Sequence, residues 1–252
     1  MTLALVLRLA TTIWLLQSAP GRDVRPLPDS GPFFEAVRAN LARSQDDQRL
    51  FAYKERRTDL NLNPFGRLGT GGVRVTQVTP IEDGKAVMIH VLERDGKPVT
   101  DTMPVRREPR MSQRGRTVVD DVAATLDVSI DRRDHVGGRD AIVAVFKPRR
   151  DAKPQTREGR LARNFSGEIW IDEQSREVFR FEAVAMEDVA FGYGMLARVN
   201  KGATVSLRRE PIEGGLWLPV SMRFNGEGRA LLLLRRLTIN FAVDWFDYRR
   251  AG

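Results

Sequence analysis

The chain has 252 residues, of which 42% are hydrophobic and 29% charged, a globular composition rather than a disordered one. It contains no cysteine, which excludes disulfides, thiolate metal sites and cysteine nucleophiles. The formal net charge is +8, and the excess is mostly arginine, in pairs such as Arg56–Arg57 and Arg149–Arg150 that are spread along the chain and interleaved with acids. Nucleic-acid binders usually concentrate positive charge on one element, so we predict no nucleic-acid partner. The dispersed charge suits a solvated surface, and it would favour an anionic membrane surface or an acidic envelope protein as a contact.

Residues 1–21 differ from the rest of the chain. An apolar run from Leu3 to Leu16, too short for a confident membrane span, ends in small residues up to Gly21. This pattern predicts a secretory signal peptide and export to the periplasm or another part of the bacterial cell envelope. Arg8 interrupts the run, so a retained N-terminal anchor and a mis-assigned start remain alternatives. Residues 22–30 are predicted to be a linker, and residues 31–250 a single domain.

The N-terminal part of this domain reads as a helix. Phe33, Phe34, Val37 and Leu41 form an apolar stripe at helical spacing, and Ser30 is a candidate N-cap. We therefore expect an amphipathic helix that packs on the sheet.

From Leu50 the period of the pattern changes to two. Residues 73–79 and 86–92 flank a turn that contains Asp83-Gly84, which predicts a β-hairpin. Val118, Val122 and Leu126 predict a second amphipathic helix. Residues 141–146 are apolar on both faces, which is typical of a strand inside a sheet. Residues 147–163 are a long polar connection, for which we expect either a mobile flap or a disordered surface loop.

The C-terminal third predicts long antiparallel strands. Residues 167–172 and 178–183 form an expected hairpin in which Phe179 and Phe181 share one face. Residues 216–224 and 237–245 alternate apolar and other side chains, and Asn225-Gly226-Glu227-Gly228 is the expected turn between them. The sum is a largely antiparallel sheet with two helices in a mainly β, α+β chain.

Catalytic signals are few. His90 and His135 have no metal-ligand spacing, no Gly-x-Ser-x-Gly or phosphate-binding loop is present, and the acidic pairs are adjacent residues that point in different directions. We therefore predict no catalytic residue, no metal and no cofactor.

Two short segments carry a family resemblance. The hairpin Gly167-Glu168-Ile169-Trp170-Ile171-Asp172 with Val178-Phe179-Arg180-Phe181-Glu182, and the later Gly215-Leu216-Trp217-Leu218-Pro219, are similar to outer-membrane lipoprotein-sorting-like proteins of the LolA/LolB superfamily. The likeness covers about residues 31–250. It implies an unclosed antiparallel β half-barrel with helices across the concave face. In that superfamily the concave apolar face and the helix lid hold acyl chains.

The resemblance suggests a ligand site and a function. The expected apolar lining is Phe179, Phe181, Leu218, Val220, Met222, Leu237, Ile239, Phe241 and Val243, although these residues would equally suit a core beneath the helices. The implied protein is a monomeric, non-enzymatic carrier or chaperone for lipid or lipoprotein acyl chains. An envelope scaffold or stress-sensing domain with a fully covered core is the main alternative, and a hydrolase with a site in the groove is a third. The chain is longer and more basic than the usual carrier, which leaves lipoprotein transfer itself open.

Overall fold

The computed structural model describes residues 25–62, 70–82, 84–100, 102–107, 115–191, 197–230 and 235–251. The predicted signal peptide therefore lies outside the described residues. The helices are α1 (Ser30–Asp47), α2 (Gly115–Thr125) and α3 (Arg157–Ala162), with a 3₁₀ turn at Gln48–Leu50. The strands are β1 (Phe51–Leu62), β2 (Thr70–Ile81), β3 (Ala86–Arg94), β4 (Lys97–Pro98), β5 (Val105–Arg107), β6 (Leu126–Val136), β7 (Arg139–Pro148), β8 (Phe165–Asp172), β9 (Val178–Ala185), β10 (Val189–Phe191), β11 (Ala197–Val199), β12 (Thr204–Pro211), β13 (Trp217–Ala230) and β14 (Arg235–Arg250).

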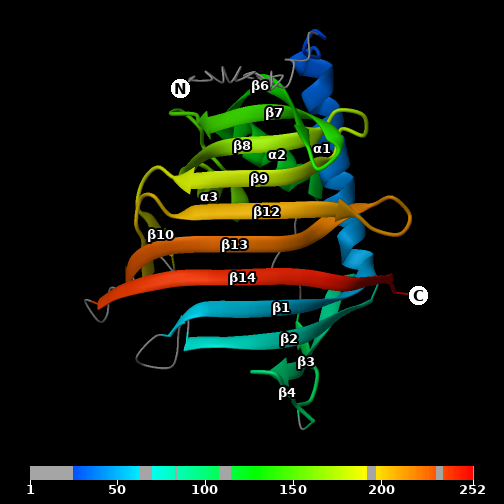
Figure 1. Ribbon diagram of the computed structural model, residues 1–252, viewed down its shortest axis with the longest axis vertical. Coiled ribbons are helices and arrows are strands. Elements are labelled where there is room, and N and C mark those ends of the chain that lie inside the picture. The colour runs from blue at the N-terminus through cyan, green and yellow to red at the C-terminus, as the bar shows by residue number, and fades with distance from the viewer. Residues whose placement is uncertain are drawn as a thin grey trace, which may run out of the picture.

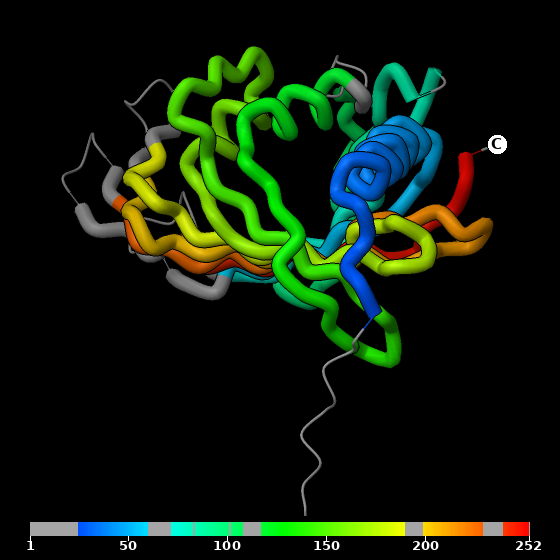
Figure 2. Tube along the Cα trace, turned by 90° about the horizontal axis from the view of Figure 1, so that it is seen from above, coloured from blue at the N-terminus to red at the C-terminus, as the bar shows by residue number. Residues whose placement is uncertain are grey.

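The described strands form one antiparallel sheet in the order β4-β3-β2-β1-β14-β13-β12-β9-β8-β7-β6 (Figure 1). The first long strand and the last, β1 and β14, pair in the interior of this order, so the two ends of the domain lie side by side within the sheet. The sheet curves and stays open, with the helices on its concave face (Figure 2). This confirms the predicted mainly β half-barrel.

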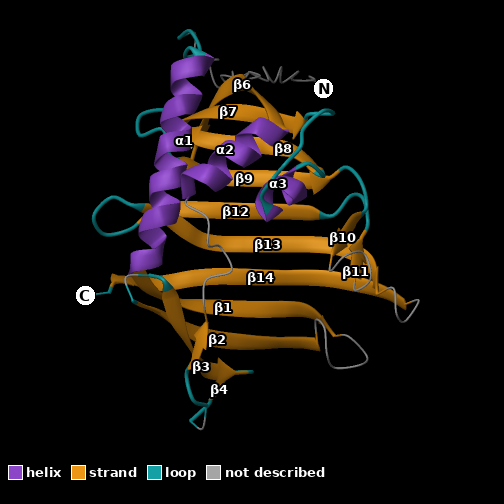
Figure 3. Ribbon diagram, turned by 180° about the vertical axis from the view of Figure 1, so that it is seen from behind, coloured by secondary structure: helices purple, strands orange, loops and turns teal. Residues whose placement is uncertain are grey.

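The helices cover one half of the concave face. α2 and α3 lie over the β6–β9 half, and α1 crosses the strands along one side (Figure 3). Because the helices lie in these places, much of the concave face of β13, β14 and β1–β3 has no described helix over it.

None of the helices formed by the described residues is long and apolar enough to cross a bilayer.

Helix α1 begins one residue away from the predicted cap. Asp29, and not Ser30, is the N-cap, because its carboxylate accepts the Gly31 N–H at 3.2 Å. Pro32 follows in the first turn, where it has no N–H to satisfy. Phe33 and Val37 then pack on the sheet beside Ile142 and Ile171, as the stripe predicted.

Strand β7 is buried on both faces, as its sequence predicted. Ile142 and Ala144 belong to the cluster that includes α1, whereas Ala141 and Val143 pack with Trp170 on the other face. The strand is paired on both sides, to β6 and to β8. The two-sided burial explains why an apolar run without alternation is stable in the sheet.

The expected turn at residues 225–228 is wrong. β13 continues through these residues, and its register with β14 runs without a break from Ser221 to Ala230. Gly226 stands in the ladder because a Cβ there would lie 2.8 Å from the Ala203 Cβ. The glycine serves close packing in a strand, where the sequence pattern suggested a turn.

Candidate functional site

An apolar cavity of about 410 Å³ lies between α1, α2 and the concave face of β6–β9. We call it the helix cavity. The helices contribute Phe34, Val37, Leu41, Val118, Val119 and Val122, and the strands contribute Val128, Ile169, Ile171 and Val178. Apart from Arg38 and Arg149, the described side chains that line it carry no charge. A cavity of this size and lining is typical of a site for a small hydrophobic ligand.

The two amphipathic stripes of the helices build this cavity. On α1, Phe33 is buried in the sheet contact, Val37 is buried and also lines the cavity, and Phe34 and Leu41 are half-buried and face the cavity. On α2, Val118 is buried and Val119 is half-buried. Each helix therefore uses part of its apolar face for core packing and leaves part of it to the cavity.

Polar contacts from the β8–β9 turn hold α1 in place. The Asn40 side-chain amide donates to the carbonyl oxygens of Ser175 and Arg176, at 2.9 and 3.2 Å. The guanidinium of Arg176 lies 4.9 Å from the centre of the Phe33 ring. These contacts fix the wall of the cavity that α1 provides.

A buried ion pair continues this network into the sheet. Glu177 is 3% exposed and Arg209 7% exposed, and their side chains approach to 3.4 Å. Arg43 of α1 reaches the other oxygen of Glu177, also at 3.4 Å. Desolvation raises the pKa of Glu177 above its ordinary value, although both arginines act in the opposite direction. Burial lowers the pKa of Arg209, while its attraction to Glu177 opposes the change.

The polar connection 147–163 is tied to α2. The Asp121 carboxylate accepts hydrogen bonds from the backbone N–H groups of Gln155 and Thr156, both at 2.9 Å. The Thr156 hydroxyl donates to the same carboxylate and accepts the Gly159 N–H at 2.9 Å, which caps α3. Desolvation acts to raise the pKa of Asp121, but these hydrogen bonds and the charge of Arg160 lower it below its ordinary value. The connection thus contains a capped helix in place of the loop that the sequence suggested.

None of the nine predicted lining residues lines the helix cavity. Phe181 lies on the concave face beyond it and stacks on Phe146, with ring centres 5.3 Å apart. Phe241 stacks on Phe224 at the same centre distance. Ile239 packs against the cluster that contains Ala185 and Val189.

The other predicted residues on β13 and β14 differ in their burial. Leu218 and Val243 are buried, at 0% and 4% exposed, and Met222 pairs directly opposite Val243. Val220 is half-buried next to a register irregularity. Leu237 falls within β14, but its side chain lies outside the described part of the structure.

The prediction that Phe179 and Phe181 share a face is wrong. The register between β8 and β9 shifts between Trp170 and Ile171, so that one extra residue of β9 stands opposite the step. Phe179 therefore packs with Ala141, Val143 and Trp170 on the convex face, and Phe181 stays on the concave face. A β-bulge changes the side of every later residue relative to simple alternation.

The helix cavity lies on other elements than the predicted lining, although the sequence carried a signal for it. The stripes Phe33–Leu41 and Val118–Leu126 were recognised as helices that pack on the sheet. Their half-buried members are the cavity walls. A stripe with more apolar residues than one contact face can bury is the pattern that indicates such a wall.

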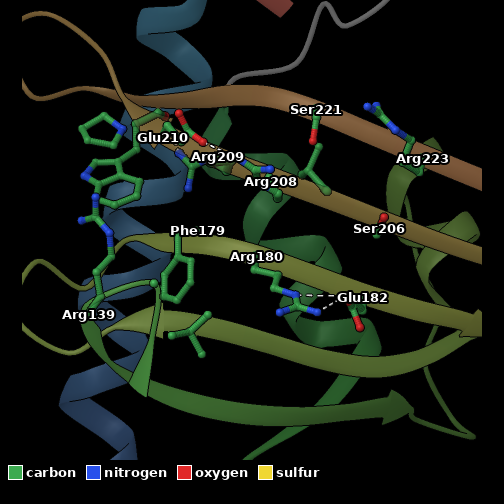
Figure 4. A pocket seen from close by; sticks show the side chains of 15 residues that line it. Arg139, Phe179, Arg180, Glu182, Ser206, Arg208, Arg209, Glu210, Ser221 and Arg223 are labelled. Atoms are coloured by element: carbon green, nitrogen blue, oxygen red, sulfur yellow. Dashed lines mark hydrogen bonds and ion pairs between the residues drawn. The ribbon is translucent and has the colours of Figure 1, made fainter. Parts of the chain in front are cut away.

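A larger and more polar groove of about 720 Å³ lies on the convex face (Figure 4). Its five arginines all have acidic partners: Arg180 with Glu182, Arg208 with Glu210, Arg139 with Asp172, Arg209 with Glu177, and Arg223 with Asp244. Figure 4 shows the first of these pairs across the middle of the groove. The balanced pairs make this groove a solvated surface rather than an apolar ligand site.

The histidines do not build a reactive centre at the helix cavity. His90 pairs with Gln77 in the β2–β3 ladder, and His135 lies on the β6–β7 turn, where its Nδ1 is 3.0 Å from an Asp140 oxygen. Neither lines the helix cavity. Within the described residues, no three His, Asp or Glu side chains are grouped to hold a metal ion.

The chain is similar to several solved structures. No family model and no curated protein matches the chain. A DUF1329 family protein from Desulfovibrio piger is 15% identical, over 86% of this chain and 92% of that one, with a TM-score of 0.36. A LolA superfamily protein from Nitrosomonas europaea is 9% identical, over 86% and 94%, with a TM-score of 0.34. An outer membrane lipoprotein-sorting protein domain from Vibrio parahaemolyticus is 10% identical, over 85% and 91%, with a TM-score of 0.38. The solved structures to which this chain is similar thus include a protein of the LolA superfamily, the superfamily that the sequence resembles.

Proposed function

We propose that the protein is an exported, periplasmic carrier that binds an acyl chain of a lipid or lipoprotein in the helix cavity and performs no catalysis on it. The single observation that carries the proposal is the apolar cavity of about 410 Å³ between two helices and a curved sheet. Export rests on the signal-peptide pattern of residues 1–21.

The size of the cavity supports this ligand class. Burial of about ten methylene groups contributes about 8 kcal/mol at ~0.8 kcal/mol each. The cost of association removes several kcal/mol, which leaves a reversible affinity of the kind that a carrier needs. Arg149 is exposed, lines the cavity and has no ion pair among the described residues, so its charge favours a carboxylate at the end of the chain.

The direct test is extraction of lipid from the purified full-length chain, followed by uptake of a fluorescent fatty acid. Val119→Trp places an indole in the cavity from a half-buried position of α2. We expect uptake to fall at least tenfold in this variant. Ala124→Trp is the matched control, because Ala124 is an exposed residue of the same helix and does not line the cavity.

Equal uptake by the two variants, with both folded as judged by their thermal unfolding, would contradict the proposal. A wild-type protein that is lipid-free after purification and takes up no fatty acid would also contradict it. That second result would favour the scaffold alternative.

A further inference from the structure

A second pocket, of about 500 Å³, lies at the opposite end of the concave face from the helix cavity. We call it the sheet-end pocket. It is formed by β1, β2, β3 and the segment 102–107, and its apolar lining includes Val78, Val87, Ile89 and Val91. It shares no lining residue with the helix cavity. In Figure 3, β1–β3 lie at the end of the sheet away from α2 and α3.

A row of cations crosses the sheet at this pocket. In the antiparallel register Arg57 stands opposite Arg74, Arg74 opposite Arg94, and Arg94 opposite Lys97. Like charges directly opposite one another destabilise a strand pair. A row of four such residues on four neighbouring strands therefore calls for compensating negative charge.

The protein itself supplies little of that charge. Arg57 is neutralised by Asp59 at 3.1 Å and lies 4.3 Å from the centre of the Phe241 ring. Arg74, Arg94 and Lys97 form no ion pair with any side chain that the structure describes.

The lining of the pocket also carries more positive than negative side chains. Arg74 lines one end of the sheet-end pocket, and Arg107, which stands opposite Val87, lines the other end. Arg107 also has no ion pair among the described side chains. Glu55 is the one carboxylate among the described lining residues, and it accepts a hydrogen bond from the Trp245 indole N–H at 3.2 Å.

The pocket also exposes apolar surface that water does not favour. Met103 is 86% exposed and Val105 is 55% exposed, and both line the pocket. An apolar floor beside unpaired guanidinium groups matches an amphiphile with an anionic head, since arginine binds phosphate oxygens well. A small inorganic anion would leave the apolar surface uncovered.

We propose that the sheet-end pocket binds an anionic phospholipid, with its phosphate at Arg74 and at Arg94, which stands directly opposite it, and the first part of its acyl chain on the valine and isoleucine floor. This site is additional to the acyl-chain cavity beneath the helices and does not depend on it.

The test compares two single-chain lipids that differ only in head charge. Calorimetric titration of the full-length protein uses lysophosphatidylglycerol and lysophosphatidylcholine with the same acyl chain, below their micelle-forming concentrations. We expect at least tenfold tighter binding of the anionic lipid. The double variant Arg74→Gln with Arg94→Gln is expected to lose this preference.

Two controls separate this site from general charge and from the helix cavity. Arg106→Gln removes a neighbouring arginine of β5 that pairs with Glu82 at 3.0 Å and does not line the pocket, so the preference is expected to persist. Val119→Trp blocks the helix cavity, and the preference is expected to persist there too.

Each contrary result overturns the inference. These results are equal binding of the two lipids by the wild type, a preference that survives in the double variant, or a preference that disappears in Val119→Trp. Binding of inorganic phosphate within tenfold of the affinity for the anionic lipid would assign the site to free phosphate and overturn the lipid assignment. Failure of fatty-acid uptake in the helix cavity leaves these readouts unaffected.

Discussion

The two members of the buried ion pair, Glu177 and Arg209, are expected to contribute unequally to the free energy of unfolding. Glu177 meets Arg209 and Arg43 at 3.4 Å each, whereas strong charge-assisted hydrogen bonds are about 2.7–2.9 Å long. The attraction is therefore too weak to offset the desolvation of the carboxylate, which raises its pKa. We predict that Glu177→Gln changes the free energy of unfolding by less than about 1 kcal/mol at neutral pH.

Arg209 contributes more than its partner. Besides the ion pair, its guanidinium donates to the carbonyl oxygens of Val178 at 2.8 Å and Trp217 at 2.6 Å. Arg209→Met leaves both carbonyls and the buried Glu177 without this donor. We predict a loss of about 3–5 kcal/mol, the range for a buried pair that loses one member.

The pH dependence separates this reasoning from simple side-chain packing. Because the pKa of Glu177 is higher in the folded protein than in the unfolded chain, its contribution to stability is full below the unfolded pKa. The contribution is lost as the pH rises through the folded pKa. Urea unfolding, followed by tryptophan fluorescence from pH 4 to 8, should show a decline in the wild type that is reduced in Glu177→Gln. A loss above about 3 kcal/mol for Glu177→Gln would refute the argument.

Two further predictions concern the frame around the site. Gly167→Ala should cost at least about 3 kcal/mol in urea unfolding, because its Cβ would lie 1.9 Å from the Glu182 backbone oxygen. The control Gly96→Ala meets no neighbouring atom and should cost only about 1 kcal/mol, for its positive φ of 76°. Asp121→Asn should cost about 1 kcal/mol at pH 7, since the carboxylate holds Gln155 and Thr156. The lowered pKa of Asp121 means that its stabilisation is present at neutral pH and lost as the pH falls through the folded pKa, so the difference between the two proteins should shrink in acid. A difference that is constant with pH would contradict this.

Local patterns determined most of the elements. Alternation predicted β2, β3, β8 and β9, and helical spacing predicted α1 and α2, because both periods follow directly from backbone geometry. The resemblance carried by residues 167–172 and 178–182 implied the open half-barrel that the structure shows.

Local patterns failed where contacts from distant strands decide the outcome. Phe179 and Phe181 alternate like any strand residues, but the irregular register with β8 moves Phe179 to the convex face. Gly226 reads as a turn residue, yet its neighbours across the sheet require a glycine within β13. A sequence shows a residue's preference but does not show which strand it will face.

The helix cavity was not predicted from the sequence for the same physical reason. The sequence by itself determined that the chain has apolar strand faces and two apolar helix stripes, because these depend only on spacing. Only the tertiary structure decided that the helices leave about 410 Å³ open between Phe34, Val119 and Ile169. Only the strand register placed Arg74 opposite Arg57 and Arg94. Cavities and charge rows arise from pairs of residues far apart in the chain, and no local period encodes that distance.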